Sequence, residues 1–560
     1  MQRCPRVELP VFSQSDSHLQ NLARFRRQCL LVVIAFVLVL PVITVFSAWL
    51  PGAGNEADAF AIVREMFATV LPGYIRTTVA LGLMVAVGAA LVGTLCAAVV
   101  TLFDFRGRKT LEWLLLLPLA MPAYVTAYAY TDFLQFSGPL QVGLRNMFGL
   151  EGRLLPEVRS LGGAVWVFIF SLYPYVYLLA RTALGERAAQ LMEAARLLGA
   201  PLPRRIRAVA LPLARPAVAA GVALVLMETL ADFGVASYFG IQTFTTGIYK
   251  AWLSMDNRLA AAQLATMLLV VVLALLHLEH RAQKRMRFAA GGVGRAGSSE
   301  AQPLVLRGGL RVVAWLVCGL PVLMGFVAPI AFMLRPLAAD WSVLPWGRFV
   351  EWAWHSVRLG GITSALAVAV ALTLAFAVRR RPDGVTRGVV QLASLGYAVP
   401  GAVIVVGLLL PVGWLQAAVP QWGIGALVTA TAVGIVWAYL VRFCAVALQS
   451  VQSGYARIPA SLDDSARMLG MGSLGLMARV HWPLLRRSTA AAALLVFVDV
   501  MKELPATMVL RPFNSDTLAV VAYQLARDER LGEAALPSLA LVAVGLVPVI
   551  LLSRTLRSRH

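Results

Sequence analysis

The chain has 560 residues, of which 59% are hydrophobic and 14% are charged, and it carries a formal net charge of +21 at pH 7. This composition excludes a soluble protein with one core and is typical of a bundle of helices that face lipid. The basic balance does not indicate a nucleic-acid partner, because the Arg residues fall in short clusters at the ends of apolar runs, where topology signals and contacts with anionic lipid headgroups lie. The sequence therefore predicts an all-α polytopic membrane protein.

The membrane spans begin near the N-terminus. An apolar run from about Cys29 to Leu50 is longer than the core of a signal peptide and lacks a convincing small-residue cleavage site, so we expect a retained first span. Hydropathy predicts further spans near residues 75–100, 111–134, 162–184, 216–236, 261–279, 310–334, 356–378, 388–410, 423–448, 488–504 and 535–553. The expected total is about twelve transmembrane helices.

The connections between the spans predict the orientation and the division of the chain. Lys and Arg gather in the connections that would share a side with the N-terminus, so the positive-inside rule predicts that both termini are cytoplasmic. The longest of these connections contains a stretch rich in Gly and Ser, which is typical of a flexible linker. We therefore predict a first repeat of six spans over residues 1–290, a linker over 291–309 and a second repeat of six spans over 310–560.

Two polar stretches between spans resemble each other. The stretch "EAARLLGAPLPRRIRAVALPLARP" covers residues 193–216, and "DSARMLGMGSLGLMARVHWPLLRR" covers residues 464–487, at an offset of about 271 residues. Six spans separate the copies, so both lie on the same side of the membrane, and the halves are expected to be parallel repeats about an axis along the membrane normal. The matched positions are Glu193 and Asp464, Ala195 and Ala466, Arg196 and Arg467, Gly199 and Gly470, and Pro212 and Pro483.

Each copy has the pattern of a short helix that ends at a glycine. In the first copy, apolar residues recur at helical spacing up to Leu198, and Gly199 then permits the left-handed conformation that ends a helix without a Cβ penalty. In the second copy, Ser461 lies three residues before Asp464 and suggests a capping box, and Gly470 ends the helix at the matching place.

The two loops, near residues 185–215 and 457–487, are therefore each expected to present a short surface helix with an apolar ridge and a sharp corner. Such a helix is suited to a groove on another protein, and it is also suited to rest on lipid headgroups. Two copies at matched positions favour docking to a partner with two lobes.

The motif E-A-A, followed by a Gly about six residues from the Glu, resembles the coupling loop of binding-protein-dependent ABC importer permeases. The resemblance implies that each loop docks on one subunit of a homodimeric P-loop ATPase, and that ATP and Mg bind to that partner. The second copy departs from the motif because it has "DSA" in place of "EAA". The coupling residues implied are Glu193, Ala194, Ala195, Gly199, Asp464, Ala466 and Gly470.

Two further stretches resemble a subfamily of these permeases. "METLADFGVASYFGIQTFTTGIYKAW", residues 227–252, and "MKELPATMVLRPFNSDTLA", residues 501–519, are similar to segments of the fused, twelve-span permeases of the ferric-iron import type. This resemblance implies import of ferric iron across the bacterial inner membrane, with the solute delivered by a periplasmic or lipid-anchored binding protein. Related fused permeases carry thiamine or organophosphonates, and these solutes remain alternatives.

Four acidic residues lie at matched positions of the two halves. Counted along the helix from the inner boundary, the first two lie in the outer half of the membrane core, and facing a translocation pathway is less costly than facing lipid. Hard oxygen ligands also suit a highly charged cation such as ferric iron. The alternative is that the acids form ion pairs with Lys502, Arg511 or Arg258, or cap broken helix ends. The candidate pathway residues are Glu228, Asp232, Asp499 and Glu503.

The sequence gives little support to other classes of function. No lysine follows a glycine, so the chain has no Walker A motif and is not expected to bind ATP or another cofactor itself. The five cysteines have no metal-binding spacing, and His277 with His280 would need more ligands, so no stable metal site is expected. An ion-coupled secondary transporter also has two parallel six-helix halves and remains an alternative, and an intramembrane enzyme is a distant third.

Overall fold

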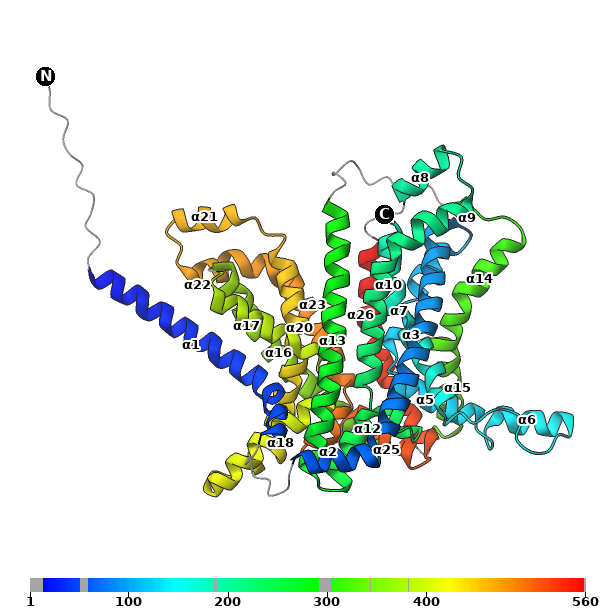
Figure 1. Cartoon of the computed structure of the whole chain (residues 1–560). Coiled ribbons are helices and arrows are strands. Elements are labelled where there is room, and N and C mark those ends of the chain that lie inside the picture. Colours follow the sequence, from blue (N-terminus) through cyan, green and yellow to red (C-terminus); the bar gives the residue numbers. More distant parts are fainter. Residues whose placement is uncertain are drawn as a thin grey trace.

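The computed structural model describes residues 14–50, 59–185, 189–291, 304–342, 344–380 and 382–557 (Figure 1). These residues are helical almost throughout, and the strands among them are the two-residue segments β1 (Phe103–Asp104) and β2 (Leu304–Val305), which pair in parallel. The prediction of an all-α membrane protein is confirmed.

The helices of the first half precede β2. They are α1 (Gln14–Thr44), α2 (Ala59–Ala68), α3 (Leu71–Leu102), α4 (Arg108–Leu114), α5 (Ala123–Leu134), α6 (Pro139–Phe148), α7 (Leu161–Ala183), α8 (Ala189–Leu197), α9 (Leu202–Arg205), α10 (Leu211–Ala231), α11 (Gly234–Tyr238), α12 (Phe244–Tyr249) and α13 (Arg258–Gly291). Short 3-10 or π turns join several of them, at η1 (Val45–Trp49), η2 (Leu117–Ala120), η4 (Ile206–Ala210) and η5 (Lys250–Ser254).

The helices of the second half follow β2. They are α14 (Gly309–Val322), α15 (Ala328–Ala339), α16 (Trp346–Arg380), α17 (Gly384–Leu395), α18 (Gly401–Ala418), α19 (Ile424–Thr429), α20 (Ala432–Tyr455), α21 (Ala460–Met468), α22 (Ser473–Gly475), α23 (Trp482–Lys502), α24 (Pro505–Leu510), α25 (Leu518–Arg527) and α26 (Leu531–Arg557). Its short turns are η6 (Leu323–Val327), η7 (Gly396–Ala398), η8 (Pro420–Trp422) and η9 (Leu476–His481).

Ten helices in the described residues are long and apolar enough to cross a membrane, or eleven if one pair bent by 90° is a single span, against about twelve expected. The bent pair begins at Arg108, and its second arm starts after Pro122, which caps α5. Pro400 caps α18 in the same way, so the predicted span 388–410 is divided between α17 and α18. The predicted span 488–504 lies in α23, which packs against α16 and α20 but carries four charged residues.

The internal repeat is present in three dimensions. Helices α7, α8, α10 and α11 recur as α20, α21, α23 and α24, and the first residues of each matched pair lie 271 positions apart. The short turn before α10, at η4, recurs as η9 before α23. The local sequence similarity of the two loops therefore extends to the helices on both sides of them.

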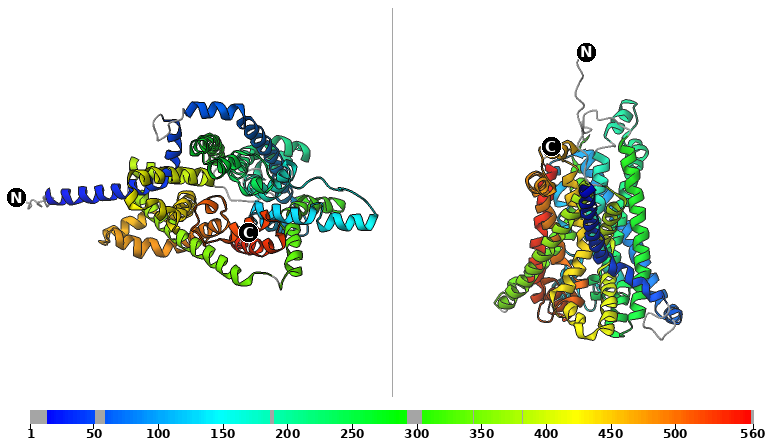
Figure 2. Two further views of the ribbon diagram at one scale, coloured as in Figure 1. Left: turned by 90° about the horizontal axis from the view of Figure 1, so that it is seen from below. Right: turned by 90° about the vertical axis from the view of Figure 1, so that its left-hand side faces the viewer.

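The first helix of each half packs on the other half. Helix α1 contacts α17, α18 and α20, and the indole N–H of Trp437 donates a hydrogen bond to the carbonyl oxygen of Val37 at 2.8 Å. In the same way α14 contacts α3 and α15 contacts α5, and the Tyr130 hydroxyl donates to the carbonyl oxygen of Met324 at 2.7 Å. Seen along the bundle, α1 and α6 project on opposite sides (Figure 2). The halves are thus interlocked, while most of the predicted linker lies outside the described residues.

Candidate functional site

The two predicted coupling helices lie at the same end of the bundle, where α8 and α21 stand away from the long helices (Figure 1). Each helix connects matched spans, since α8 lies between α7 and α10 and α21 lies between α20 and α23. The arrangement expected for a partner with two lobes is therefore available geometrically.

Both helices end at the predicted glycine corner. Gly199 has φ of +78° and Gly470 has φ of +79°, in the left-handed region that residues with a side chain rarely adopt. The N–H of Gly199 donates to Arg196 at 2.9 Å, and the N–H of Ala200 donates to Ala195 at 3.0 Å. The same pair of hydrogen bonds, at 2.9 and 3.0 Å, closes the second corner, from Gly470 to Arg467 and from Met471 to Ala466. This is the Schellman geometry.

The acidic residues of the two motifs also match. Glu193 pairs with Arg196 at 3.7 Å, and Asp464 pairs with Arg467 at 3.3 Å. All four side chains are well exposed, so these pairs add little stability and leave the charges accessible to a partner. The predicted capping box is wrong, because Ser461 lies inside α21, and Pro459 caps that helix without a side-chain hydrogen bond.

The small residues of the motifs differ in exposure. Ala194 is exposed and Ala195 is half-buried, whereas Ala466 is buried. Exposed apolar residues that the sequence analysis had not singled out as coupling residues lie at both tips. Leu198 is 88% exposed and its counterpart Leu469 is 79% exposed, and beside them Leu197 and Met468 are equally prominent. An apolar pair directly before a helix-ending glycine was the available sequence signal.

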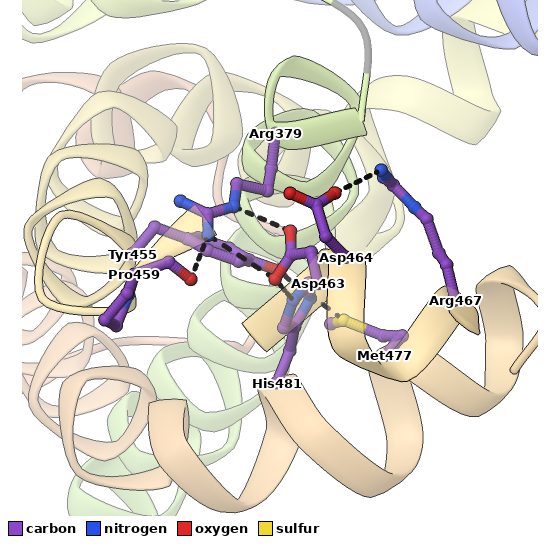
Figure 3. Close-up of polar contacts among 8 residues, drawn as sticks. All are labelled: Arg379, Tyr455, Pro459, Asp463, Asp464, Arg467, Met477 and His481. Atoms are coloured by element: carbon purple, nitrogen blue, oxygen red, sulfur yellow. Dashed lines mark hydrogen bonds and ion pairs between the residues drawn. The ribbon is translucent and has the colours of Figure 1, made fainter. Parts of the chain in front are cut away.

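A buried polar cluster, missed in the sequence, holds the second loop (Figure 3). Asp463, only 4% exposed, accepts a hydrogen bond from Arg379 Nε at 2.8 Å and contacts His481 Nε2 at 3.0 Å. Arg379 also donates to the carbonyl oxygen of Pro459 at 2.9 Å, just before α21. Burial opposes ionisation of this carboxyl, but the hydrogen bonds from Arg379 and His481 and the positive charge of Arg379 outweigh it and lower the pKa of Asp463.

His481 is enclosed from several sides. Its side chain is fully buried, Tyr455 Oη lies 3.3 Å from its Nδ1, and the ring of Phe376 packs edge-on at 5.7 Å. A neutral imidazole satisfies both nitrogens if Nε2–H donates to Asp463 and Nδ1 accepts from Tyr455. The cluster therefore ties α16, α20 and η9 to the second coupling helix.

A cavity of about 200 Å³ lies between the halves and is lined by all four candidate pathway acids. Two cations, Arg442 and Lys502, also line it. The structure thus brings together residues from α10, α20 and α23 that are far apart in the sequence. The candidate acids in its wall are Glu228, Asp232, Asp499 and Glu503.

Two of these acids cap broken helix ends. Asp232 accepts a hydrogen bond from the N–H of Val235 at 2.8 Å, at the start of α11. Glu503 accepts from the N–H groups of Ala506 and Thr507, each at 3.0 Å, and pairs with Arg442 at 3.1 Å. The contacts of Asp232 and Glu503 are thus those of helix caps, which is the alternative that the sequence left open.

The other two acids are less engaged. Glu228 accepts one hydrogen bond, from the Tyr397 hydroxyl at 3.1 Å. Within the described part of the chain, no hydrogen bond or ion pair of the Asp499 side chain is present, although it lies in the wall near Lys502. Glu228 and Asp499 occupy matched positions of the repeat, so they are the carboxylates most available to a solute.

The alternative of ion pairs with Lys502, Arg511 or Arg258 is not seen as a direct pair among the described residues. Lys502 donates to the carbonyl oxygen of Leu119 at 3.0 Å, Arg511 pairs with Asp516, and Arg258 contacts Asp256 at 3.9 Å. Among the described residues, the cation that pairs with a candidate acid is Arg442, which had not been considered. Arg442 and Glu503 lie 61 residues apart in the sequence, so no local sequence pattern indicated their pairing.

In the described ranges, the cavity included, no group of three or more His, Cys, Asp or Glu side chains is arranged to hold a metal ion. Cys96, Cys318 and Cys444 are buried and reduced, whereas Cys29 is exposed. His280 hydrogen-bonds the carbonyl oxygen of Leu276 at 2.8 Å.

The bundle has two matching halves, matched glycine corners at one end and a cavity lined by charged side chains between the halves. These features together are typical of a membrane permease. Residues 89–287 match the family described as the binding-protein-dependent transport system inner membrane component. This segment includes the first coupling helix and its glycine corner.

Similar proteins extend the match over both halves. The chain is 24% identical over 533 residues to the Fe(3+)-transport system permease protein FbpB 2 of Haemophilus influenzae, covering 94% of this chain and 97% of that protein. It is 22% identical to the ferric transport system permease protein FbpB of Actinobacillus pleuropneumoniae, over 89% of this chain and 73% of that protein. It is also 24% identical to a putative 2-aminoethylphosphonate transport system permease protein of Salmonella paratyphi A, covering 46% of this chain and 89% of that protein.

These matches make the chain similar to permease subunits of binding-protein-dependent importers, over residues 89–287 for the family and over 94% of the chain for the Haemophilus protein. Its long apolar helices are those of a multi-pass membrane protein. Permeases of this class work with an ATPase and with a solute-binding protein.

Proposed function

We propose that this chain is the membrane subunit through which an ATP-driven importer moves ferric iron across the inner membrane by alternating access. The observation that carries the proposal is the near full-length similarity to a permease named for Fe(3+) transport, together with the paired Glu228 and Asp499 in the cavity. Carboxylate oxygens are hard ligands of the kind that suit a highly charged cation. The iron is the transported solute and binds to these residues only transiently.

The two coupling loops carry the proposed link to ATP hydrolysis. Each loop docks on one subunit of a homodimeric P-loop ATPase, which binds ATP and Mg, while this chain binds no cofactor. The exposed apolar tips, with Leu198 and Leu469 at matched positions, support this role because large exposed apolar side chains mark interaction sites when they are paired with accessible charges. The coupling residues proposed from the sequence, Glu193, Ala194, Ala195, Gly199, Asp464, Ala466 and Gly470, all belong to these helices or their corners.

The orientation follows from this docking. The end of the bundle with α8 and α21 faces the cytoplasm, as do both termini, and the solute-binding protein delivers iron at the opposite end. Residues 1–290 and 310–560 act as the two repeats, joined by the 291–309 linker. Closure of the ATPase dimer then moves the two interlocked halves against each other around the cavity.

The pathway in this proposal divides the four acids by their contacts. Glu228 and Asp499 meet the solute, and Asp232 and Glu503 keep the broken spans in shape by capping α11 and α24. The capping acids also keep negative charge near the path, which favours a cation.

A second candidate solute is 2-aminoethylphosphonate. The observation that favours it is the presence of Arg442 and Lys502 in the cavity wall, because guanidinium and ammonium groups bind phosphonate oxygens. Similarity to the Salmonella protein covers about half of this chain, so this candidate has less support than iron. Thiamine, also a candidate from the sequence, has no specific observation in its favour.

The deciding experiment is uptake in a strain that lacks this chain. Radioactive iron and radioactive 2-aminoethylphosphonate are offered separately, with the wild-type chain, Asp499→Asn, or Glu151→Gln as an exposed acid remote from the cavity. Iron uptake that depends on the chain and falls in Asp499→Asn, with Glu151→Gln normal, supports the proposal. Uptake of the phosphonate alone would overturn the iron assignment. Accumulation by purified chain without any ATPase would instead indicate an ion-coupled secondary transporter.

A further inference from the structure

The two coupling loops are fastened to the bundle by different chemistry. We propose that the second loop is the stiffer one, and that Asp463 is the positioning residue that holds α21 in the orientation needed to receive motion from the ATPase. This inference rests on the docking role proposed above.

The second loop is attached by a cluster with fixed geometry (Figure 3). Arg379, at the end of α16, donates hydrogen bonds to both carboxylate oxygens of Asp463, from Nε at 2.8 Å and from Nη2 at 3.4 Å. Its Nη2 also donates to the carbonyl oxygen of Pro459. From the other side His481 contacts the same carboxylate at 3.0 Å. A fork-shaped guanidinium on a carboxylate restricts direction as well as distance, so α21 is held against rotation about its own axis.

The described residues of the first loop show no comparable attachment. Met192 and Ala210, both buried, occupy the positions that match Asp463 and His481 at the offset of 271 residues. In the described part of this loop, the charged side chains of α8 form the pair Glu193 with Arg196 within the helix, and no side-chain hydrogen bond or ion pair joins α8 to a spanning helix. Its contact with the bundle is apolar, and Met is a flexible side chain that tolerates shifts of its neighbours.

The difference matters because a coupling helix must pass displacement to the spans behind it. Apolar contacts are weak one by one and non-directional, so a helix held by them can slide or roll under load. A buried ionic cluster resists the same movement, because separating its members would leave an uncompensated charge in a low dielectric. ATPase motion should therefore reach α16, α20 and α23 more directly than it reaches the matched helices of the first half.

The fastening itself is tested by hydrogen exchange of the full chain in nanodiscs, without ATPase or solute. We expect backbone amides of residues 460–471 to exchange about tenfold more slowly than those of 189–200 in the wild type, after correction for intrinsic rates. Asp463→Ala should bring the two loops within about threefold of each other. The matched control is Asp464→Asn, an exposed acid one residue away. Asp464 is a proposed coupling residue, but no ATPase is present in this measurement, so the exchange of both loops should be unchanged.

Equal exchange of the two wild-type loops would overturn the inference, as would an Asp463→Ala variant that remains as protected as the wild type. If Asp463→Ala does not accumulate in the membrane, Arg379→Gln decides by the same measurement, because it removes the guanidinium fork and leaves Asp463 in contact with His481.

The positioning role is tested in the assembled transporter by the amount of ATP hydrolysed for each solute transported. In Asp463→Ala we expect this ratio to rise about tenfold, because transport falls to about one tenth while basal hydrolysis is kept, and Asp463→Glu should recover part of the coupling. A transplant of the first anchor, Asp463→Met with His481→Ala, should also uncouple. Full coupling in the transplant would overturn the positioning role.

The two tests separate this inference from the proposed function. Slow exchange of the second loop combined with an unchanged ratio in Asp463→Ala would mean that the fastening exists but the positioning role is wrong. Loss of coupling with either solute would support the positioning role whatever the cargo is.

Discussion

Replacement of Gly199 by Val tests the glycine corner without disturbing any packing. A Cβ atom added at Gly199, or at Gly470, would meet no other atom within 4 Å, so the substitution creates no clash. Its whole effect comes from the backbone, since φ is +78° and a β-branched residue is poorly suited to that region.

The magnitude follows from the left-handed conformation. An L-residue held there costs roughly 1–2 kcal/mol, and a β-branched residue lies at the upper end of that range. At about 1.4 kcal/mol for each factor of ten, a strain of about 2 kcal/mol disfavours the native corner by about 25-fold relative to alternatives in which the loop leaves the helix in another direction. A whole domain is stable by about 5–15 kcal/mol, so the bundle itself should remain folded.

Gly199→Asn is the matched control, because Asn is the residue after glycine that most readily adopts this conformation. Both variants add a side chain at the same exposed place and differ mainly in backbone strain. We expect Val to lose most solute-stimulated ATP hydrolysis in the reconstituted complex and Asn to keep at least about half of it. Expression and monodispersity of the permease should be normal in both.

Normal stimulated hydrolysis in Gly199→Val would refute the reasoning, and so would equal losses in Val and Asn, which would indicate a steric effect on the partner. The same comparison at Gly470, where φ is +79°, checks whether both corners are needed.

Leu469→Asp should weaken association with the ATPase by about tenfold in co-purification, because it puts a charge at an exposed apolar tip; an undiminished complex would contradict docking there. The double variant Glu228→Gln with Asp499→Asn should lower iron uptake about fivefold or more with normal basal hydrolysis. Recovery of uptake on removal of Lys502 as well would mean that the acids serve a charge balance and do not line the path. Exchange protection of residues 460–471 should be constant from pH 8 to about pH 5 and should fall below about pH 4. The reason is that folding lowers the pKa of the Asp463 carboxyl. The stabilisation by this carboxylate is therefore fully present above its unfolded-state pKa of about 3.9 and is lost as the pH falls through its folded-state pKa. Protection lost between pH 8 and 6 would contradict this.

The parts of the site that sequence could predict are local ones. The corners at Gly199 and Gly470 depend on one residue's backbone freedom and a few preceding positions, so the pattern alone located them. The offset of 271 residues also predicted which helices would correspond, because duplicated sequence keeps its local structure.

The parts that sequence missed depend on partners far apart in the chain. Asp463 was passed over in favour of its exposed neighbour Asp464, because the burial of one and the exposure of the other are decided by Arg379, 84 residues away. The same reason explains Arg442, whose pairing with Glu503 joins α20 to the end of α23. Helix breaks at Pro122 and Pro400 were visible as prolines, but hydropathy averages over about 19 residues and conceals a sharp bend inside an apolar run.

The cavity shows how a duplicated protein departs from its own symmetry. The acids recur in both halves, Glu228 with Asp499 and Asp232 with Glu503, but the cations do not. Ala231 occupies the position that matches Lys502, and Ser171 the position that matches Arg442, and both line the same cavity. Symmetry in the cations as well would give four of each sign and a neutral wall.

Cations from one half alone leave four acids facing two bases, so the wall keeps an excess of negative charge when all six groups are ionised. Such a wall attracts a cation but binds it less tightly than four carboxylates without neighbouring cations would. Weak binding is needed because the cation must also leave the cavity. Because both cations come from the second half, where one pairs with Glu503, the negative excess lies toward the first half and Glu228. Glu228→Gln alone should therefore reduce iron uptake more than Asp499→Asn alone, and the reverse order would place the path on the other side of the axis.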